Sequence, residues 1–375
     1  MRRVGFVIGQ LGWGGAERQL FELASRIRER GFEPFVYCLS EIHHPYKELL
    51  ERESIPVRSL LPWSHFDLRR VFTLRSALRR DRIEVVHAWL LNDNAYAAFA
   101  LLGRSLPWIA SLRSRPKDRD SFRRRIDKWA FSRSIRITAN SSEVAEYLRC
   151  EYGCPDGKIV VIGNGIDPER LRATRTRAVV RRELDTPLDA PTLVFAGRLE
   201  PVKNIPFLLR VFDEFRTRCP EAILWLVGDG SQKNALREEI RRLSLETCVR
   251  MLGLRADVPD LLHAADLSVL CSHSEGLPNV VLESMGCGTP PAVTDSCGCR
   301  DIVVHGVTGW ICPEESPSAF TETIELALSD PGILRKVGER ALEAVTLKHA
   351  PGEMVRQTTQ LYTQLLRSPQ PALVS

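Results

Sequence analysis

Short apolar runs alternate with amphipathic segments along the first half of the chain. RRVGFVIGQ, residues 2–10, has the apolar density of a buried strand. After a glycine-rich turn, AERQLFELASRIRERG at 16–31 repeats apolar positions at spacings of three and four, which is typical of a helix. Further strands are expected at 32–40, 83–90, 107–114, 135–141 and 158–167, and a helix at 94–103. Such alternation predicts a parallel sheet with crossover helices.

The same alternation restarts in the second half. Between Asp167 and Thr192 the chain is polar and contains three prolines, so we interpret residues 171–190 as a linker between domains at 1–170 and 191–350. Strands are expected at 192–200, 222–230, 248–254, 267–274 and 291–295, with helices at 205–218, 233–245, 257–265 and 279–288. In doubly wound sheets ligands bind beyond the carboxyl ends of the strands, so the expected site is a cleft between two such domains.

Composition fits a globular protein, with 44% hydrophobic and 26% charged residues among 375. No apolar run approaches the roughly 20 residues that span a bilayer, and MRRVGFVIGQ lacks the features of a signal peptide. We therefore expect a cytoplasmic protein. Its ten cysteines are scattered without zinc-ligand spacing, which favours buried free thiols over disulfides.

A glycine-rich turn follows the first expected strand. GQLGWGGAERQL, residues 9–20, leads into a helix N-terminus, where unpaired amides and the helix dipole favour anions. It does not fit the dinucleotide-binding fingerprint, because Glu17 occupies the position of the last glycine. The turn is either a close-approach loop for a ligand or a structural turn.

Two cations follow the first strand of the second half. In FAGRLEPVKN, residues 195–204, Arg198 and Lys203 come just after the strand's end, which suits phosphate binding. Taken alone, this stretch would favour two solvated surface cations.

Two carboxylates flank a proline in HSEGLPNVVLESMGCGTP, residues 273–290. Glu275 lies in a loop after a strand, Pro278 suits a first helical turn, and Glu283 lies inside the helix. Backbone amides of residues 276–280 would then point into the cleft and hold a diphosphate or sugar hydroxyls. The alternative is a capping glutamate followed by an ordinary helix residue.

Several stretches together resemble retaining glycosyltransferases of family 4 (GT4). FAGRLEPVKN, LWLVGDG, Glu275 and Glu283 with seven residues between them, GTPPAVTDSCG and VVHGVTGWICP occur in that family's order and spacing. GGAERQL, VVHAW, ITANSSEV and VIGNGID in the first half are similar to its corresponding stretches. The resemblance implies the GT-B fold: two doubly wound Rossmann-like α/β domains facing each other across a cleft, with a C-terminal helix near 353–367 returning to the first domain.

The resemblance also implies catalytic residues. Arg198 and Lys203 match the pair that compensates the charge of the departing nucleoside diphosphate, so neither a metal nor another cofactor is expected. Glu275 matches the carboxylate at the transferred sugar. His87 matches a histidine that reaches into the cleft from the acceptor-side domain, although taken alone it would be a buried structural histidine.

Donor-binding residues are implied in the same way. Glu283 matches the carboxylate that holds the ribose hydroxyls, and Met251 is expected at the nucleobase. The remaining expected donor contacts are Gly14, Gly15, Gly276, Leu277, Pro278, Asn279 and Val280.

The implied reaction transfers a hexosyl unit, with retention, from a UDP or GDP sugar to a glycan or lipid-linked acceptor of cell-surface polysaccharide biosynthesis. With one glutamate at the sugar and the other at the ribose, the acid and nucleophile pair of a glycoside hydrolase is disfavoured. Two alternatives remain: an epimerase acting on a nucleotide sugar, and a non-catalytic nucleotide-sugar-binding protein.

A basic segment lies at residues 113–136, where ten Arg and Lys face three Asp, interleaved with Phe122, Trp129 and Phe131. It is either a peripheral contact with the anionic inner face of the plasma membrane or a solvated helix face paired with nearby acids. Nucleic acid is a poorer partner, because no recognised nucleic-acid motif accompanies it.

Overall fold

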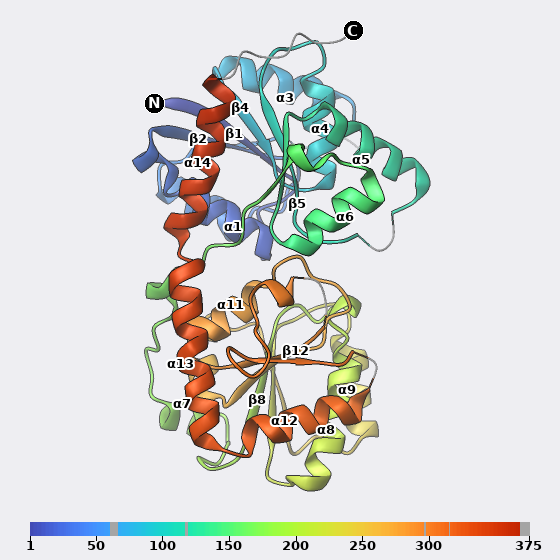
Figure 1. The fold of residues 1–375 in the computed structure, drawn as a ribbon, viewed down its shortest axis with the longest axis vertical. Helices are drawn as coiled ribbons and strands as arrows, with labels where there is room; N and C mark the ends of the chain where they lie inside the picture. The colour runs from blue at the N-terminus through green and yellow to red at the C-terminus, as the bar shows by residue number, and fades with distance from the viewer. Residues whose placement is uncertain (61–66, 117–118, 296–297, 315, 368–375) are drawn as a thin grey trace. The chain divides into compact units, whose positions relative to one another are not determined.

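The computed structural model describes residues 1–60, 67–116, 119–295, 298–314 and 316–367. The chain divides into two compact units, each described by itself below. Unit 1 comprises Met1–Gly165 and Pro351–Ser375, and unit 2 comprises Ile166–Ala350. Both are α/β, with helices on a parallel sheet, so the expected fold class is confirmed (Figure 1).

Within its described residues, unit 1 contains one seven-stranded parallel sheet in the order β3-β2-β1-β4-β5-β6-β7. The strands are β1 Arg2–Ile8, β2 Phe32–Cys38, β3 Val57–Ser59, β4 Val85–Ala88, β5 Trp108–Leu112, β6 Arg136–Ala139 and β7 Ile159–Val161. The helices are α1 Gly15–Ala24, α2 Tyr46–Arg52, α3 Arg69–Arg80, α4 Leu91–Ala100, α5 Ser121–Arg133, α6 Ser142–Tyr152 and α14 Pro351–Arg367.

Helices cover both faces of this sheet, because apolar side chains of the strands point alternately to either face. Val4, Phe6 and Ile8 of β1 belong to a buried cluster shared with α1 and α14. Val7 belongs to the cluster on the other face, which α3, α4 and α6 complete. The C-terminal helix α14 thus packs beside α1 within unit 1 (Figure 1).

Unit 2 contains, in its described part, a six-stranded parallel sheet in the order β10-β9-β8-β11-β12-β13. The strands are β8 Thr192–Ala196, β9 Ile223–Val227, β10 Val249–Gly253, β11 Leu267–Leu270, β12 Pro291–Thr294 and β13 Trp310–Cys312. The helices are α7 Arg177–Glu183, α8 Ile205–Arg218, α9 Lys233–Arg242, α10 Val258–Ala264, α11 Asn279–Gly286, α12 Pro317–Leu328 and α13 Pro331–Lys348.

The segment interpreted as a linker, residues 171–190, is instead part of unit 2. It contains α7, whose Arg181 has no exposed surface. The Arg181 guanidinium donates to backbone oxygens of four residues and forms an ion pair with Asp266 at 2.8 Å; the four are Pro187, Leu188, Ala190 and Ala264. These bonds tie the polar, proline-containing segment to the body of the unit, so the boundary falls at residues 165 and 166 rather than after it.

Candidate active site

The strand order of unit 2 reverses between β8 and β11. From β8 the sheet continues to β9 and β10, and from β11 it continues in the other direction to β12 and β13. At such a switch point the loops after the two central strands diverge, and ligands bind at that carboxyl edge. The loops that begin there carry the two cations and Glu275 singled out in the sequence.

Lys203 and Glu275 form an ion pair at this edge. Lys203 ends a 3-10 turn, Pro201–Lys203, after β8, and Glu275 lies in the loop after β11. Each side chain keeps only 15% of its surface exposed. Ser272 donates from Oγ to Glu275 Oε1 at 2.7 Å, a contact that the sequence did not indicate. The structure thus brings together two residues that are 72 positions apart in the sequence.

Arg198 lies two residues beyond β8, and its side chain is exposed. The same stretch is joined to the β11 loop by a backbone bond, in which His273 N donates to Val202 O at 2.9 Å. The loop therefore has a defined position, while the Arg198 guanidinium remains open to a ligand.

Two glycines permit close packing of the loops around this edge. Gly228, after β9, has φ +139°, and a Cβ there would lie 1.8 Å from Gly197 O. Gly298 has φ +74°, and a Cβ there would lie 1.5 Å from Gly276 O. No L side chain fits at either position, because both the backbone conformation and the space favour glycine.

Helix α11 begins at Asn279, with Pro278 as its N-cap, which changes the expected set of amide donors. Proline has no backbone N–H, so Pro278 cannot donate to a ligand. The amides of Val281 and Leu282 already donate to Pro278 O. Among residues 276–280, the backbone N–H groups are therefore those of Gly276, Leu277, Asn279 and Val280.

Glu283 lies in the second turn of α11 and is half-buried. Met251 lies on β10, an edge strand of the sheet, and is partly buried against the core of unit 2. Both belong to the unit that carries Lys203 and Glu275, while His87, Gly14 and Gly15 belong to unit 1.

His87 lies inside unit 1, which corrects the interpretation of it as a residue reaching into a cleft. It is 2% exposed. Its Nδ1 lies 2.7 Å from the hydroxyl of Tyr362, and its Nε2 lies 2.8 Å from Ser111 Oγ. Burial lowers the pKa of His87 to about 3, with Arg113 acting in the same direction. Both ring nitrogens are occupied, so His87 is the buried structural histidine of the alternative interpretation.

Gly14 and Gly15 open α1, with Gly14 as N-cap. A Cβ on Gly14 would lie 2.1 Å from Glu17 Oε2. Glu17 is itself 4% exposed and accepts a hydrogen bond from Gln10 Nε2 at 3.0 Å. The glycine thus makes room for a buried carboxylate, a structural reason that holds without any ligand.

The basic segment divides into two parts in the structure. Helix α5 carries exposed Arg123, Arg125 and Lys128 beside Phe122, which is 65% exposed. Arg113 lies apart from α5, directly after β5, and is half-buried. Residues 117–118 of the segment lie outside the described residues.

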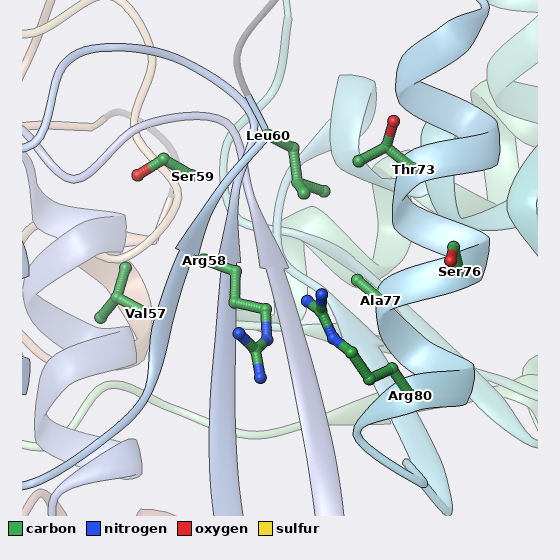
Figure 2. Close-up of a pocket in the computed structure, with 8 residues that line it drawn as sticks. All are labelled: Val57, Arg58, Ser59, Leu60, Thr73, Ser76, Ala77 and Arg80. Carbon is green, nitrogen blue, oxygen red and sulfur yellow. The ribbon is translucent and has the colours of Figure 1, made fainter.

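A surface cavity of about 370 Å³ lies between β3 and α3 of unit 1 (Figure 2). Its two cations, Arg58 and Arg80, extend toward each other between strand and helix. Both lie within 4 Å of an Asp81 carboxylate oxygen, so their charge is already partly compensated. None of the expected site residues lines this cavity.

Among the residues that the structure describes, no group of three or more His, Cys, Asp or Glu side chains could hold a metal ion. In that same part of the chain, no helix has the length and apolarity to cross a membrane.

Comparison with known proteins supplies the context for this site. Residues 13–170 match the family model "Glycosyltransferase Family 4", and residues 176–344 match "Glycosyl transferases group 1". The lipopolysaccharide core biosynthesis glycosyltransferase LpsE of Rhizobium meliloti (strain 1021) is 30% identical over 95% of this chain and 96% of that one. The N-acetyl-alpha-D-glucosaminyl L-malate synthase of Bacillus anthracis is 24% identical over 92% and 93%.

Among solved structures, Anabaena HepE in complex with UDP-glucose has a TM-score of 0.87 at 23% identity, covering 97% of this chain and 100% of that one. The fold is therefore the GT-B fold of glycosyltransferases. Within that class, the chain belongs to glycosyltransferase family 4.

Proposed function

We propose that the protein transfers a hexosyl unit from a nucleotide-diphosphate sugar, and that the donor binds at the carboxyl edge of β8 and β11 in unit 2. The observation that carries the proposal is the Lys203–Glu275 pair at the switch point of that sheet. HepE, which has the same fold, was solved with UDP and with UDP-glucose. This supports a UDP sugar ahead of a GDP sugar.

Arg198 and Lys203 would bind the diphosphate and compensate the charge that develops on it as the sugar departs. Lys203 supplies a compact positive charge from a half-buried position, and exposed Arg198 supplies a planar guanidinium with several donors. Such charge compensation acts where negative charge grows in the transition state, and it requires no metal ion.

Glu275 would accept hydrogen bonds from hydroxyls of the transferred sugar, and Glu283 would hold the ribose. Between them, the amides of Gly276, Leu277, Asn279 and Val280 would contact the centre of the donor. The two carboxylates act as a clamp rather than as an acid and nucleophile pair. Transfer would proceed with retention at the anomeric carbon.

The acceptor would be a glycan or a lipid-linked precursor, in the biosynthesis of a cell-surface polysaccharide. LpsE, a relative that matches nearly the whole chain, is named for lipopolysaccharide core biosynthesis. Exposed Phe122 among the cations of α5 would place a cytoplasmic enzyme at an anionic leaflet, where such acceptors lie.

The proposal is tested by incubating the protein with a panel of UDP and GDP sugars and saccharide acceptors and measuring nucleoside diphosphate release. Release should depend on both donor and acceptor, and Lys203→Ala and Glu275→Ala should abolish it while circular dichroism shows the fold retained. Undiminished transfer by both variants would refute the site. Sugar-nucleotide conversion without an acceptor would indicate an epimerase instead.

A further inference from the structure

Arg113 occupies the carboxyl edge of the unit 1 sheet. It is the first residue after β5, which lies next to β4. The strand order of this sheet also reverses, between β1 and β4, so unit 1 has a switch point of its own. The carboxyl edge beside such a point is where doubly wound sheets bind ligands.

Residues that follow three other strands of the same sheet hold the arginine in place. Its guanidinium lies over the ring of Trp89, which follows β4, at 4.6 Å from the ring centroid. Its Nη2 donates to Asn164 Oδ1, beyond β7, at 2.5 Å, and its backbone oxygen accepts from Asn140 Nδ2, beyond β6, at 3.2 Å. A long side chain fixed by a ring and an amide loses little further freedom when it binds a ligand.

The charge of Arg113 is poorly compensated. No acid among the described residues lies within 4.0 Å of its guanidinium. Burial lowers the pKa of Arg113 to about 10, and Glu17 acts in the opposite direction from a longer distance. The Glu17 carboxylate instead accepts a hydrogen bond from Gln10. The Trp89 ring and the Asn164 amide offset part of the cost of removing this cation from water, but neither supplies a negative charge, which an anionic ligand would.

A further polar group at the same edge lacks a partner: Asn140 Oδ1 is buried and accepts no hydrogen bond from any residue that the structure describes. The Asp93 carboxyl, also buried at this edge, accepts from the backbone amides of Gly9 and Leu90. Asn140 is 3% exposed and Asp93 1% exposed. Burial raises the pKa of the Asp93 carboxyl well above its usual range. A buried amide oxygen left without a donor beside a cation without an ion pair is more typical of a binding site than of a stabilising core.

We propose that Arg113 is a substrate-contacting residue that binds an oxyanion, either a phosphate or a carboxylate group of a substrate. The planar guanidinium matches both groups with paired N–H donors, and an anion supplies the charge that unit 1 itself does not place beside it. The proposal rests on the proposed function in taking glycosyl transfer as the reaction. Two groups can supply this oxyanion: the diphosphate of the donor and an acidic group on the acceptor.

The test uses the full-length protein and calorimetric titration with three probes: UDP, glucose 6-phosphate and glucose. Arg113→Met removes the charge but keeps an aliphatic stem, Arg113→Lys keeps the charge without the fork, and Arg123→Met removes an arginine of α5 that is 61% exposed. Arg113→Met should weaken at least one of the two anionic probes about tenfold or more, as expected for a lost charge-assisted hydrogen bond. Arg113→Lys should be intermediate, and Arg123→Met should match wild type.

The pattern of loss identifies the source. A weakened UDP affinity assigns Arg113 to the donor, and a weakened glucose 6-phosphate affinity with unchanged glucose assigns it to an acidic acceptor. Unchanged affinities for both anions in folded Arg113→Met, or no binding of either by wild type, would overturn the proposal. Lys203→Met tests the donor site of unit 2 independently, so UDP affinity lost with Arg113→Met but retained with Lys203→Met would refute that donor site and leave Arg113 standing.

Discussion

Replacing Lys203 and replacing Glu275 should change the affinity for a nucleotide in opposite directions. The Lys203 ammonium is paired with Glu275, which also accepts a hydrogen bond from Ser272. A diphosphate must therefore compete with Glu275 for the lysine. Lys203→Met removes the group that the diphosphate needs, whereas Glu275→Gln removes its competitor and a negative charge that repels it.

The sizes of the two changes in UDP affinity follow from the interactions that each variant removes. A hydrogen bond to a charged group contributes about 1.5–3 kcal/mol, which corresponds to a UDP affinity about 10- to 150-fold weaker in Lys203→Met. Because the cost of removing two mostly buried charges from water offsets much of their attraction, the net interaction of the pair is smaller, about 1 kcal/mol. Glu275→Gln should therefore bind UDP up to about fivefold more tightly than wild type.

Calorimetric titration of UDP into wild type and the two variants measures these effects, with nucleotide release in the presence of donor and acceptor as a second readout. Glu275→Gln should combine tighter UDP binding with loss of transfer, because its carboxylate is assigned to the sugar rather than to the diphosphate. If Glu275→Gln weakened UDP as much as Lys203→Met does, the assignment of separate roles would be wrong.

Three further predictions test other parts of the structure. Arg181→Met should destabilise unit 2 by about 3 kcal/mol or more, since it leaves Asp266 and several buried carbonyls without their donor. Calorimetry should show a lower unfolding temperature for unit 2 only. Equal shifts of the unfolding temperature in both units would contradict the placement of α7. Gly298→Ala should weaken UDP binding by displacing Gly276. Gly288→Ala is the matched control, because Gly288 has a similar φ of +72° and nothing lies within 4 Å of a Cβ built there. Equal effects of the two variants on UDP binding would show that backbone strain alone is responsible. The pKa of His87 is about 3 in the folded chain and 6.5 in the unfolded chain. As the pH falls, the unfolded state therefore takes up the proton first, and the folded state loses stability below about pH 6.5. This group contributes a loss of up to about 1.4 kcal/mol per pH unit. In His87→Gln, denaturant unfolding at pH 7 and pH 5 should show a smaller loss on acidification, and a loss as large as in wild type would contradict the burial of a neutral His87.

The alternating strands and helices were predictable because each is specified by a local apolar period. The positions of Arg198, Lys203 and Glu275 at strand ends follow from the same pattern, since a charged residue just beyond a buried apolar run must leave the sheet. Their pairing was not predictable from spacing, because it depends on β8 and β11 becoming neighbours in the sheet.

His87 shows why a residue near a strand end is ambiguous. Its position on β4 fits a side chain reaching outward as well as one buried in the sheet. The partner that occupies its Nδ1 is Tyr362, 275 residues further along the chain on α14. No local pattern reports that contact, so the distinction required the tertiary structure.

Arg181 and α3 show a second reason why the sequence did not predict the whole structure. Charged residues suggest exposure, even where the side chain is buried or the segment is a helix. Arg181 makes residues 171–190 look polar and exposed, yet five protein groups satisfy its guanidinium inside unit 2. Helix α3, RRVFTLRSALRR, was not predicted at all, because five arginines surround its few apolar positions. Only Leu74, Ala77 and Leu78 of that helix are buried.

Hydrogen exchange of the full chain with and without saturating UDP tests the central claim most directly. UDP should slow exchange of the backbone amides in residues 197–204 and 271–283, around β8, β11 and the start of α11. Lys203→Met should reduce this protection at the same UDP concentration. Protection confined to unit 1, or no protection in either stretch of wild type at saturating UDP, would contradict a nucleotide-sugar site at the switch point of unit 2.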